Sequence, residues 1–483
     1  MTYDVVIGLE VHAQLNTASK IFSPASTQYG AEPNTQACEI DLGLPGTLPV
    51  LNEKVIQKAV LFGVSIGAEI NQENVFARKN YFYPDLPKGY QISQYSQPIV
   101  GRGYIDITLK DHSTKRIGIT RAHLEEDAGK STHSYDSNRS LVDLNRAGTP
   151  LLEIVSEPDM RSAEEAVAYL KQLHQLVQHL EICDGNMQEG SFRCDINISL
   201  KPKGQEAFGT RAEIKNVNSF RFVEKAILYE IDRQTHILNC GDKVVQETRQ
   251  YDPETNQTRS MRSKEDAHDY RYFPDPDLLP VKITDDFIDQ VRVSLPELPQ
   301  HKIQRYISEL ELTHDDASQI CSDRNSALYF EALMAAVPKA KPKTIANWIN
   351  GEISAALNKS QANWKTVPID VQMIAPLFEK LSTKSISNTI AKKIFSLLWE
   401  TKKDINQIIE DEGYQQMNDS AALEKIITDI VLSNKKQVIE YQAGKTKLFG
   451  YFVGQVMKAT KGQANPEQVN DLLHRALTTK SQS

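Results

Sequence analysis

The chain has 483 residues, of which 40% are hydrophobic and 24% charged, a composition typical of a globular protein of about three domains. Its formal net charge of −8 excludes a protein that coats polyanions indiscriminately, so any nucleic acid must meet a local basic patch. No apolar run approaches the ~20 residues that cross a bilayer, and residues 1–4 lack the basic start of a secretory signal, so we expect a cytoplasmic protein without membrane contact.

The chain divides into three successive regions that differ in sequence pattern. Residues 1 to about 290 mix alternating segments with Gly, Pro, Asn and Asp turns, which predicts a strand-rich α+β region. Residues from about 295 to 405 carry longer apolar patterns of helical period, and the last ~75 residues are again helical but richer in Lys and Gly. We therefore expect three domains, over residues 1–293, 294–405 and 406–483.

The first segment alternates apolar and polar residues along a predicted strand. One face carries Glu10, His12 and Gln14, and the other is apolar, with Val5, Ile7, Leu9, Val11, Ala13 and Leu15. Residues two apart on a strand project side by side about 6.5–7 Å apart, so Glu10 and His12 offer a carboxylate and an imidazole to one divalent cation. A polar face that simply meets solvent is the alternative.

Two helices are predicted in the same region. One spans residues 53–62 and ends at Gly63 as its C-cap, and the other spans residues 162 to about 182, with Ser162 as its N-cap. The first helix excludes a hydrolase nucleophile at Ser65, although a Gly-x-Ser-x-Gly pattern surrounds it, because that motif needs a strand before the serine. We find no P-loop, Gly-x-Gly-x-x-Gly or His-Glu-x-x-His motif, so ATP, if used, is bound without those loops.

Three acids crowd together at Glu125, Glu126 and Asp127, directly after an alternating run over residues 117–121. Neighbouring carboxylates repel one another unless a cation or an arginine lies among them. Alternation would send Glu125 and Glu126 to opposite faces, so both serve one site only if the strand bulges or ends there. An exposed acidic turn is the alternative.

Two later segments, residues 191–200 and 211–215, repeat the pattern of a half-charged face. Their polar faces carry, in order, Arg193, Asp195, Asn197 and Ser199, then Arg211, Glu213 and Lys215. Strands of this kind predict a sheet whose polar face lines a cleft, where carboxylates hold Mg²⁺ and cationic side chains meet phosphate oxygens. Coincidence is the alternative, because each segment alone is a weak signal.

Several stretches, spread in order over almost the whole chain, are similar to one family. They are VIGLEVH (6–12), RKNYFYPD (78–85), PKGYQISQY (87–95), HLEEDAGK (123–130), NR (145–146), PLLEIVSEP (150–158), YRYFPDPD (270–277) and GQVMKATKGQANP (454–466). On these motifs the chain resembles the B subunit of the aspartyl/glutamyl-tRNA(Asn/Gln) amidotransferase family.

The resemblance implies a fold and an activity that the residues alone do not give. The first region would be a cradle domain with a kinase-like site, followed by a helical domain and a small helical tail domain that binds tRNA. With ATP and Mg²⁺, the protein would phosphorylate the side-chain carboxylate of Asp-tRNA(Asn) or Glu-tRNA(Gln), and ammonia would displace the phosphate to give Asn-tRNA(Asn) or Gln-tRNA(Gln). The family works as a heterotrimer, in which a glutaminase subunit releases ammonia from glutamine and a small third subunit wraps around the other two.

The resemblance also implies site residues. The catalytic and metal-binding positions are Glu10, His12, Glu125 and Glu126, with Asp195 and Glu213 as further metal ligands. Face and charge make Arg193, Lys215 and Asn216 our candidates for contacts with ATP or substrate. The stretch that resembles the lining of an ammonia channel contains Lys79, Tyr81 and Lys88. Alternatively, the aromatic residue there packs in the core and both lysines lie at the surface.

The five cysteines are scattered and form no CxxC pair, which predicts a reducing compartment and neither a disulfide scaffold nor a four-thiolate zinc site. Some members of the family carry a CxxC at the position of Cys38 that looks like part of a zinc site. Here Asp41 replaces the second thiolate, so we expect no zinc.

Positive charge gathers in the last region, where six lysines between residues 435 and 461 accompany a single acid, Glu440. Lysines on a helix suit sequence-independent contact with RNA phosphates, and a solvated helix face is the alternative. Because of the resemblance, we expect tRNA contacts from Lys445, Lys447, Lys458 and Lys461. No aromatic stacking platform is visible in the sequence, so we expect the RNA to be recognised by shape.

Two other functions stay open at this point. A two-metal phosphoesterase would use the same acidic strands without ATP or glutamine. A non-catalytic scaffold would dock tRNA through the tail lysines. Phosphate release without ATP distinguishes the first, and the second predicts no ATP turnover that depends on Glu125.

Overall fold

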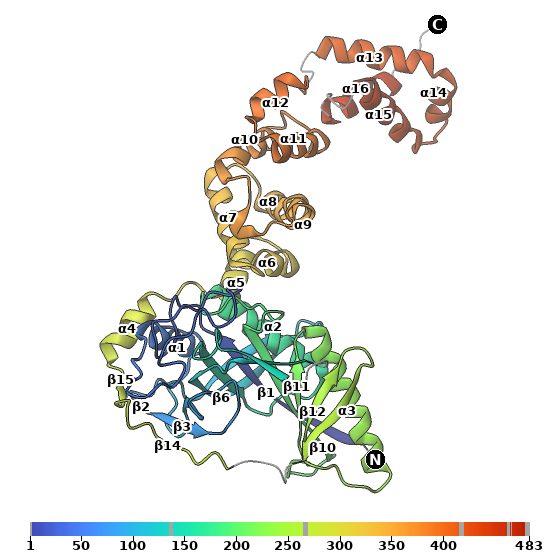
Figure 1. The fold of residues 1–483 in the computed structure, drawn as a ribbon. Helices are drawn as coiled ribbons and strands as arrows, with labels where there is room; N and C mark the ends of the chain where they lie inside the picture. The colour runs from blue at the N-terminus through green and yellow to red at the C-terminus, as the bar shows by residue number, and fades with distance from the viewer. Residues whose placement is uncertain are drawn as a thin grey trace. The chain divides into compact units, whose positions relative to one another are not determined.

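The computed structural model describes residues 2–134, 139–263, 269–414, 420–460, 464 and 466–478. The chain forms two compact units, Met1–Pro299 and Gln300–Ser483. The first is built around one large sheet and the second from helices (Figure 1). The predicted α+β class, with a strand-rich first region followed by helices, is therefore confirmed.

One sheet of eleven strands forms the centre of the first unit, in the order β13–β12–β11–β10–β1–β9–β6–β4–β3–β14, and β5 pairs with β6 outside this path. Its strands are β1 (Tyr3–Gln14), β3 (Phe76–Asn80), β4 (Tyr90–Gln94), β5 (Gly103–Thr108), β6 (Thr114–Glu126), β9 (Pro150–Ser156), β10 (Phe192–Pro202), β11 (Ala212–Val217), β12 (Glu247–Asp252), β13 (Gln257–Ser263) and β14 (Phe273–Pro274). Two short pairs lie outside it: β2 (Glu73–Asn74) with β15 (Val281–Lys282), and β7 (Lys130–Ser134) with β8 (Arg139–Asp143). The strands predicted to carry polar faces, β1, β6, β10 and β11, therefore share one sheet, and β9 lies between β1 and β6.

Helices pack on the apolar side of this sheet. Ile7, Leu9 and Val11 of β1 are at most 1% exposed. They share one core with residues of α1 (Glu53–Ser65), α2 (Ala163–His179), α3 (Phe220–Asn239) and α4 (Asp285–Val293). Ser162 caps α2 as predicted, because its side chain accepts the backbone N–H three residues on. Since alternate residues of β1 enter the core, its polar residues lie on the opposite face, as predicted.

One predicted helix end is wrong. Helix α1 continues to Ser65, so Gly63 lies inside the helix rather than at its C-cap. A methyl group added at Gly63 would collide with the side chains of Ile70 and Val100, so this glycine permits close packing instead of ending the helix. The residues before Ser65 form a helix and not a strand, which agrees with the exclusion of a hydrolase nucleophile.

A buried network of charges ties α3 to β12 and β13. The side chain of Glu230 is fully buried, and its carboxylate oxygens lie 2.9 Å from guanidinium nitrogens of Arg233 and Arg249. The side chains of Thr258 and Gln234 also donate to it. Burial raises the pKa of the Glu230 carboxyl, but the hydrogen bonds from Arg233 and Thr258 outweigh burial and hold this pKa below its ordinary value. The ionised carboxylate is therefore the form that the fold stabilises.

The second unit is helical and contains two apolar clusters, one with buried residues between Tyr306 and Ile409 and one between Leu423 and Leu477. Its helices are α5 (Pro299–Leu310), α6 (His314–Ile320), α7 (Arg324–Ala336), α8 (Pro342–Trp348), α9 (Ser354–Ser360), α10 (Val371–Ser382), α11 (Asn388–Thr401), α12 (Ile405–Asp411), α13 (Ser420–Ser433), α14 (Lys435–Gln442), α15 (Leu448–Ala459) and α16 (Pro466–Thr478). The first cluster reaches past residue 405, the expected domain boundary, and the three-domain division stays a prediction. Within the described ranges, no helix has the length and apolarity of a membrane span.

Candidate active site

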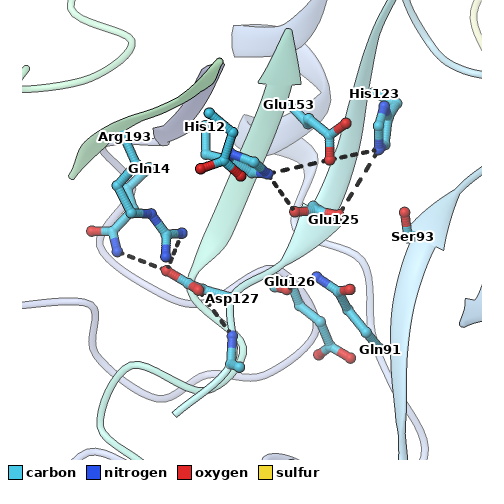
Figure 2. A network of polar contacts seen from close by, with 12 residues as sticks. His12, Gln14, Gln91, Ser93, His123, Glu125, Glu126, Asp127, Glu153 and Arg193 are labelled. Atoms are coloured by element: carbon cyan, nitrogen blue, oxygen red, sulfur yellow. Dashed lines mark hydrogen bonds and ion pairs between the residues drawn. The ribbon is translucent and has the colours of Figure 1, made fainter. Parts of the chain in front are cut away.

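Polar side chains from four strands meet in the middle of the sheet (Figure 2). In the strand register, His123 of β6 faces Glu153 of β9, which in turn faces His12 of β1. On its other side, His12 faces Arg193 of β10. Facing residues of antiparallel strands put their side chains on the same face about 4.5–5.5 Å apart, so these four residues form one row. Glu125, two residues after His123, joins them on that face.

Three of these residues, His12, Glu125 and Glu153, form a tight group that we call the central cluster. Nε2 of His12 lies 3.3 Å from Oε2 of Glu153 and 3.7 Å from Oε1 of Glu125. One ligand atom from each residue lies within 4.8 Å of the other two. Two carboxylates and an imidazole at this spacing can surround one divalent cation.

The charges of the central cluster are strongly coupled. Burial and the charge on Glu153 raise the pKa of Glu125 to about 7. Burial alone would lower the pKa of His12, but its hydrogen bond to Glu153 and the nearby carboxylate charges raise this pKa to about 9. Burial would likewise raise the pKa of Glu153, and the neighbouring histidines hold it below its ordinary value. A protonated His12 therefore balances the two carboxylates, and a bound cation could take over that role.

His123 borders the central cluster and adds no charge to it at pH 7. Its Nε2 lies 3.5 Å from Oε2 of Glu153 and 3.8 Å from Oε2 of Glu125. Burial lowers the pKa of His123 to about 4, so its ring is neutral at pH 7. Its buried Nδ1 has no hydrogen-bond partner within the described part of the chain. His123 therefore contacts both carboxylates as a neutral group.

A second polar group lies beside the central cluster, toward β10 and β11. Nζ of Lys215 lies 2.8 Å from Oδ2 of Asp195 and 3.1 Å from Oε1 of Glu213. Burial lowers the pKa of Lys215, but the charges of these two carboxylates outweigh burial and raise it. Glu10 faces Asp195 across β1 and β10 and accepts a hydrogen bond of 2.8 Å from Nδ2 of Asn197. Asp195 and Glu213, both predicted as metal ligands, thus form ion pairs with Lys215.

Glu126 lies outside the central cluster, and its role as a metal ligand stays a prediction. Strand β6 ends at Glu126, and alternation turns its side chain away from that of Glu125. Its Oε2 lies 2.6 Å from Nζ of Lys88, and its Oε1 accepts the backbone N–H of Ile92 at 2.8 Å. Glu126 and Lys88, which the sequence assigns to different roles, therefore form one largely buried ion pair.

Arg193 pairs with a buried acid that the sequence prediction leaves without a role. Its Nη2 lies 2.9 Å from Oδ2 of Asp127, which also accepts a hydrogen bond of 3.0 Å from Gln14 and lies 3.6 Å from Nε of Arg146. The side chain of Arg193 is still 34% exposed, so part of its guanidinium can reach a phosphate. The backbone of Asn216 lies in β11, and its side chain falls outside the described structure.

The predicted channel residues lie on the other side of the central cluster. Nζ of Lys79 is 5.1 Å from the ring centre of Tyr270 and 6.0 Å from that of Tyr81. Burial, and then the charges of Glu125 and other nearby acids, raise the pKa of the Tyr81 phenol. Lys79, Tyr81 and the Lys88 ion pair therefore all lie near the acidic end of β6.

Asp41, which stands where some relatives have a thiolate, has a lysine as its partner. It accepts hydrogen bonds of 3.1 Å from Nζ of Lys20, 2.9 Å from Oγ of Ser23 and 3.0 Å from the backbone N–H of Cys38. Lys20 is fully buried, so this pair joins two stretches of irregular chain. The expectation of no zinc stays a prediction.

Three of the four predicted tail lysines, Lys445, Lys447 and Lys458, are exposed on or beside α15. Lys447 directly precedes α15, and Lys458 lies in its last turn. Nζ of Lys445 lies 3.0 Å from Oε2 of Glu440, a pair that solvent screens. Lys461 lies outside the described residues.

Glu153 and His123 are site residues that the sequence prediction lacks. Glu153 is an acid between Leu152 and Ile154, both fully buried. A single acid in such a buried strand needs a hydrogen-bonding or charged partner, and this pattern could have identified Glu153 as a site residue. His123 shares its face with Glu125 by simple alternation, which could have identified it as well.

Comparisons with known proteins match the chain over nearly its whole length. The family model described as "GatB/GatE catalytic domain" matches residues 5–289, and the one described as "GatB domain" matches residues 328–477. Curated relatives are named as the B subunit of aspartyl/glutamyl-tRNA(Asn/Gln) amidotransferase. One from Thioalkalivibrio sulfidiphilus is 59% identical over 477 residues, and one from Pseudomonas syringae pv. tomato is 55% identical over 481 residues. Each match covers 99% of this chain and 100% of the relative.

Proposed function

The chain belongs to the B-subunit family of the aspartyl/glutamyl-tRNA(Asn/Gln) amidotransferases, and we propose that its central cluster activates a carboxylate for amidation. It is one subunit of a tRNA-dependent amidotransferase, an enzyme complex. In this proposal, ATP is the phosphoryl donor, and the acceptor is Asp-tRNA(Asn), Glu-tRNA(Gln) or both. A glutaminase subunit supplies ammonia, and a small third subunit completes the heterotrimer. The names of the relatives favour neither a phosphoesterase nor a non-catalytic scaffold.

The reaction has two steps, because a carboxylate is already an anion and resists attack by ammonia. A side-chain carboxylate oxygen of the aminoacyl group attacks the γ-phosphorus of ATP, and the bond from that phosphorus to the bridging oxygen breaks to release ADP. Ammonia then attacks the carbonyl carbon of the acyl phosphate, loses a proton and expels phosphate. The first step joins two anions, so cationic groups must screen their approach.

The residues of the central cluster fit a magnesium ion. His12, Glu125 and Glu153 would hold it, because their ligand atoms converge within 4.8 Å and their two buried carboxylates need a cation between them. A bound Mg²⁺ would supply positive charge to the phosphates of ATP. Arg193 and Lys215, on β10 and β11, would meet the phosphate oxygens from one side. Glu10, oriented by Asn197, would add a carboxylate near the ion.

The observation that carries this proposal is the convergence of His12, Glu125 and Glu153 from three strands on one face of the sheet. The test is co-expression with the two candidate partner subunits, followed by assays on each mischarged tRNA. Conversion that requires both ATP and glutamine supports the proposal. If the protein releases phosphate from esters without ATP, the proposal is wrong and the protein is a phosphoesterase.

Replacing Lys215 by methionine should raise the KM for ATP about tenfold. The change removes the cation between Asp195 and Glu213 and leaves two carboxylates facing the phosphates. A hydrogen bond to a charged group is worth about 1.5–3 kcal/mol, and we expect the lower end because the Lys215 side chain is 39% exposed. Steady-state amidation at varied ATP measures the effect. The exposed Lys203→Met is the matched control, and an unchanged KM in Lys215→Met would contradict the assignment.

Replacing Lys88 by methionine should lower glutamine-dependent amidation by roughly tenfold, the scale of one charge-assisted hydrogen bond. The change leaves Glu126 as a buried unpaired anion beside the proposed path of ammonia, where it would favour ammonium over ammonia. Glu126→Gln in the same chain should recover part of the activity, because it removes that anion. Lys110→Met, at an exposed position, serves as the control. If the single and double variants lose activity equally, the ion pair has a different role.

The proposal extends to the tail, where Lys445, Lys447 and Lys458 are exposed and would contact tRNA phosphates, with Lys461 beyond the described residues. Contacts of this kind carry no sequence information, and they weaken as salt rises. The tail would therefore position the tRNA, and the choice of acceptor would be made elsewhere.

A further inference from the structure

Aromatic side chains gather at the strands β3, β4 and β14. The rings of Tyr95 and Tyr272 stack, with centres 4.2 Å apart and planes within 10° of parallel. Tyr270 packs edge-on against Tyr272 and Tyr81 at 6.2 and 6.1 Å, and Tyr83 continues the row at 5.7 Å from Tyr81. We call these five residues the tyrosine wall. The sequence shows no aromatic stacking platform, and for that reason we expect RNA to be recognised by shape alone. The fold, however, brings such a platform together from distant segments of the chain.

Tyr95 presents an open ring face at one end of this wall. It is 59% exposed, whereas Tyr272 behind it is half-buried. A ring that is stacked on one side is held in place and still offers its other side. Unstacked nucleobases bind to aromatic faces of this kind in proteins that recognise single-stranded ends of RNA.

The tyrosine wall lies next to the central cluster. Ser93 of β4 faces Glu125 of β6 (Figure 2). Tyr95 follows Ser93 by two residues. Burial, and then the charges of Glu125 and Glu153, raise the pKa of the Tyr272 phenol. If a ligand binds to the ring of Tyr95, the groups attached to that ligand would therefore lie at the central cluster.

Arg193 and Lys215, the side chains proposed to meet the phosphates, lie on the opposite side of the central cluster. Lys79 lies on the side of the wall, with its Nζ 5.1 Å from the ring centre of Tyr270. Arg193 and Lys215 belong to β10 and β11, whereas the tyrosines of the wall lie at the ends of β3, β4 and β14. Strands β1, β9 and β6 lie between these two groups in the sheet. In phosphoryl transfer, the attacking and leaving oxygens lie roughly in line on either side of the phosphorus. If Arg193 and Lys215 meet the phosphates of the donor, the acceptor carboxylate must approach from the side of the wall.

We infer that Tyr95, backed by Tyr272, stacks on the base of the 3′-terminal adenosine of the aminoacyl-tRNA. This inference rests on the proposed function, in which the acceptor carboxylate belongs to an amino acid esterified to that adenosine. The ribose and the aminoacyl group esterified to it separate the base from the carboxylate. A base stacked on Tyr95 therefore brings the carboxylate to the central cluster.

The test measures how the assembled complex binds two tRNA transcripts, one ending in CCA and one ending in CC. The wild-type complex should bind the CCA form at least about fivefold more tightly, the scale of one base stacked on an aromatic ring. Tyr95→Ala and Tyr272→Ala should bind both transcripts equally, and Tyr95→Phe should keep the preference because it keeps the ring. Tyr104→Ala, an exposed tyrosine on β5, is the matched control and should behave as wild type.

Two outcomes would overturn the inference. In one, the alanine variants keep the preference for the CCA form. In the other, the wild-type complex binds the two transcripts equally. A raised KM for ATP in the alanine variants would then place the adenine of ATP on the wall. The binding assay uses neither ATP nor glutamine, so it can fail while the wild-type amidation assay succeeds, and the two proposals are tested separately.

Discussion

Replacing Glu153 by glutamine should lower ATP-dependent amidation by the assembled complex by about 10²–10³-fold, the scale of losing one preorganised electrostatic contact at a reacting centre. Glu153 contacts both His12 and His123 and lies at the middle of the row across the sheet. Glutamine keeps the shape of the side chain and removes its charge. With ammonium chloride as the nitrogen donor, the measurement does not depend on the partner glutaminase.

The comparison with two other glutamates makes this test specific. Glu126→Gln removes an acid next to Glu125 in sequence, but one that pairs with Lys88. With ammonium as donor it should keep most of the activity. Glu189→Gln, at an exposed position, should be neutral. Full activity in Glu153→Gln, or an equal loss in all three variants, would remove the central cluster from the reaction.

A calorimetric titration with Mg²⁺ adds a measurement that does not require activity. The wild-type protein should bind the ion, and both Glu153→Gln and His12→Ala should bind it much more weakly, since each removes one of three ligands. Binding that is unchanged in both variants would place the ion elsewhere.

Replacing Glu230 by alanine should lower the free energy of unfolding of the first unit by about 3–5 kcal/mol, the cost of breaking a buried ion pair on one side. The change removes the fully buried carboxylate that Arg233 and Arg249 share, and leaves Glu247 as the one carboxylate near both guanidinium groups in the described part of the chain. The urea midpoint, followed by circular dichroism, measures the effect. Glu224→Ala, at an exposed position on the same helix, makes the same change in helix propensity and should lower the free energy of unfolding far less. Equal midpoints for the two variants would contradict this role.

The same carboxylate gives a pH dependence with a definite sign. Because the folded pKa of Glu230 lies below its ordinary value, its contribution to stability is present above the unfolded pKa of about 4.3. That contribution is lost as the pH falls through the lower, folded pKa. Stability of the wild-type protein should therefore decrease on acidification below about pH 4.3, and Glu230→Ala should show a shallower decrease over the same range.

Local sequence patterns predicted faces of strands, but they could not predict which strands lie side by side. Alternation placed Glu10 and His12 together correctly, and it warned that Glu125 and Glu126 point in opposite directions. It could not show that β9 enters between β1 and β6, because strand order depends on packing between distant segments. Glu153 is part of the site only through that order. The stacking of Tyr95 on Tyr272 depends on the same kind of long-range contact.

The central place of β1 in the sheet has a consequence for the order in which the protein can fold during synthesis. The ribosome makes β1 well before its two neighbours, β9 and β10, which come from residues 150–156 and 192–202. Both edges of β1 stay unpaired until those segments have been synthesised, and unpaired strand edges readily bind other chains. The nascent chain therefore passes through a long stage in which its first strand needs protection from aggregation.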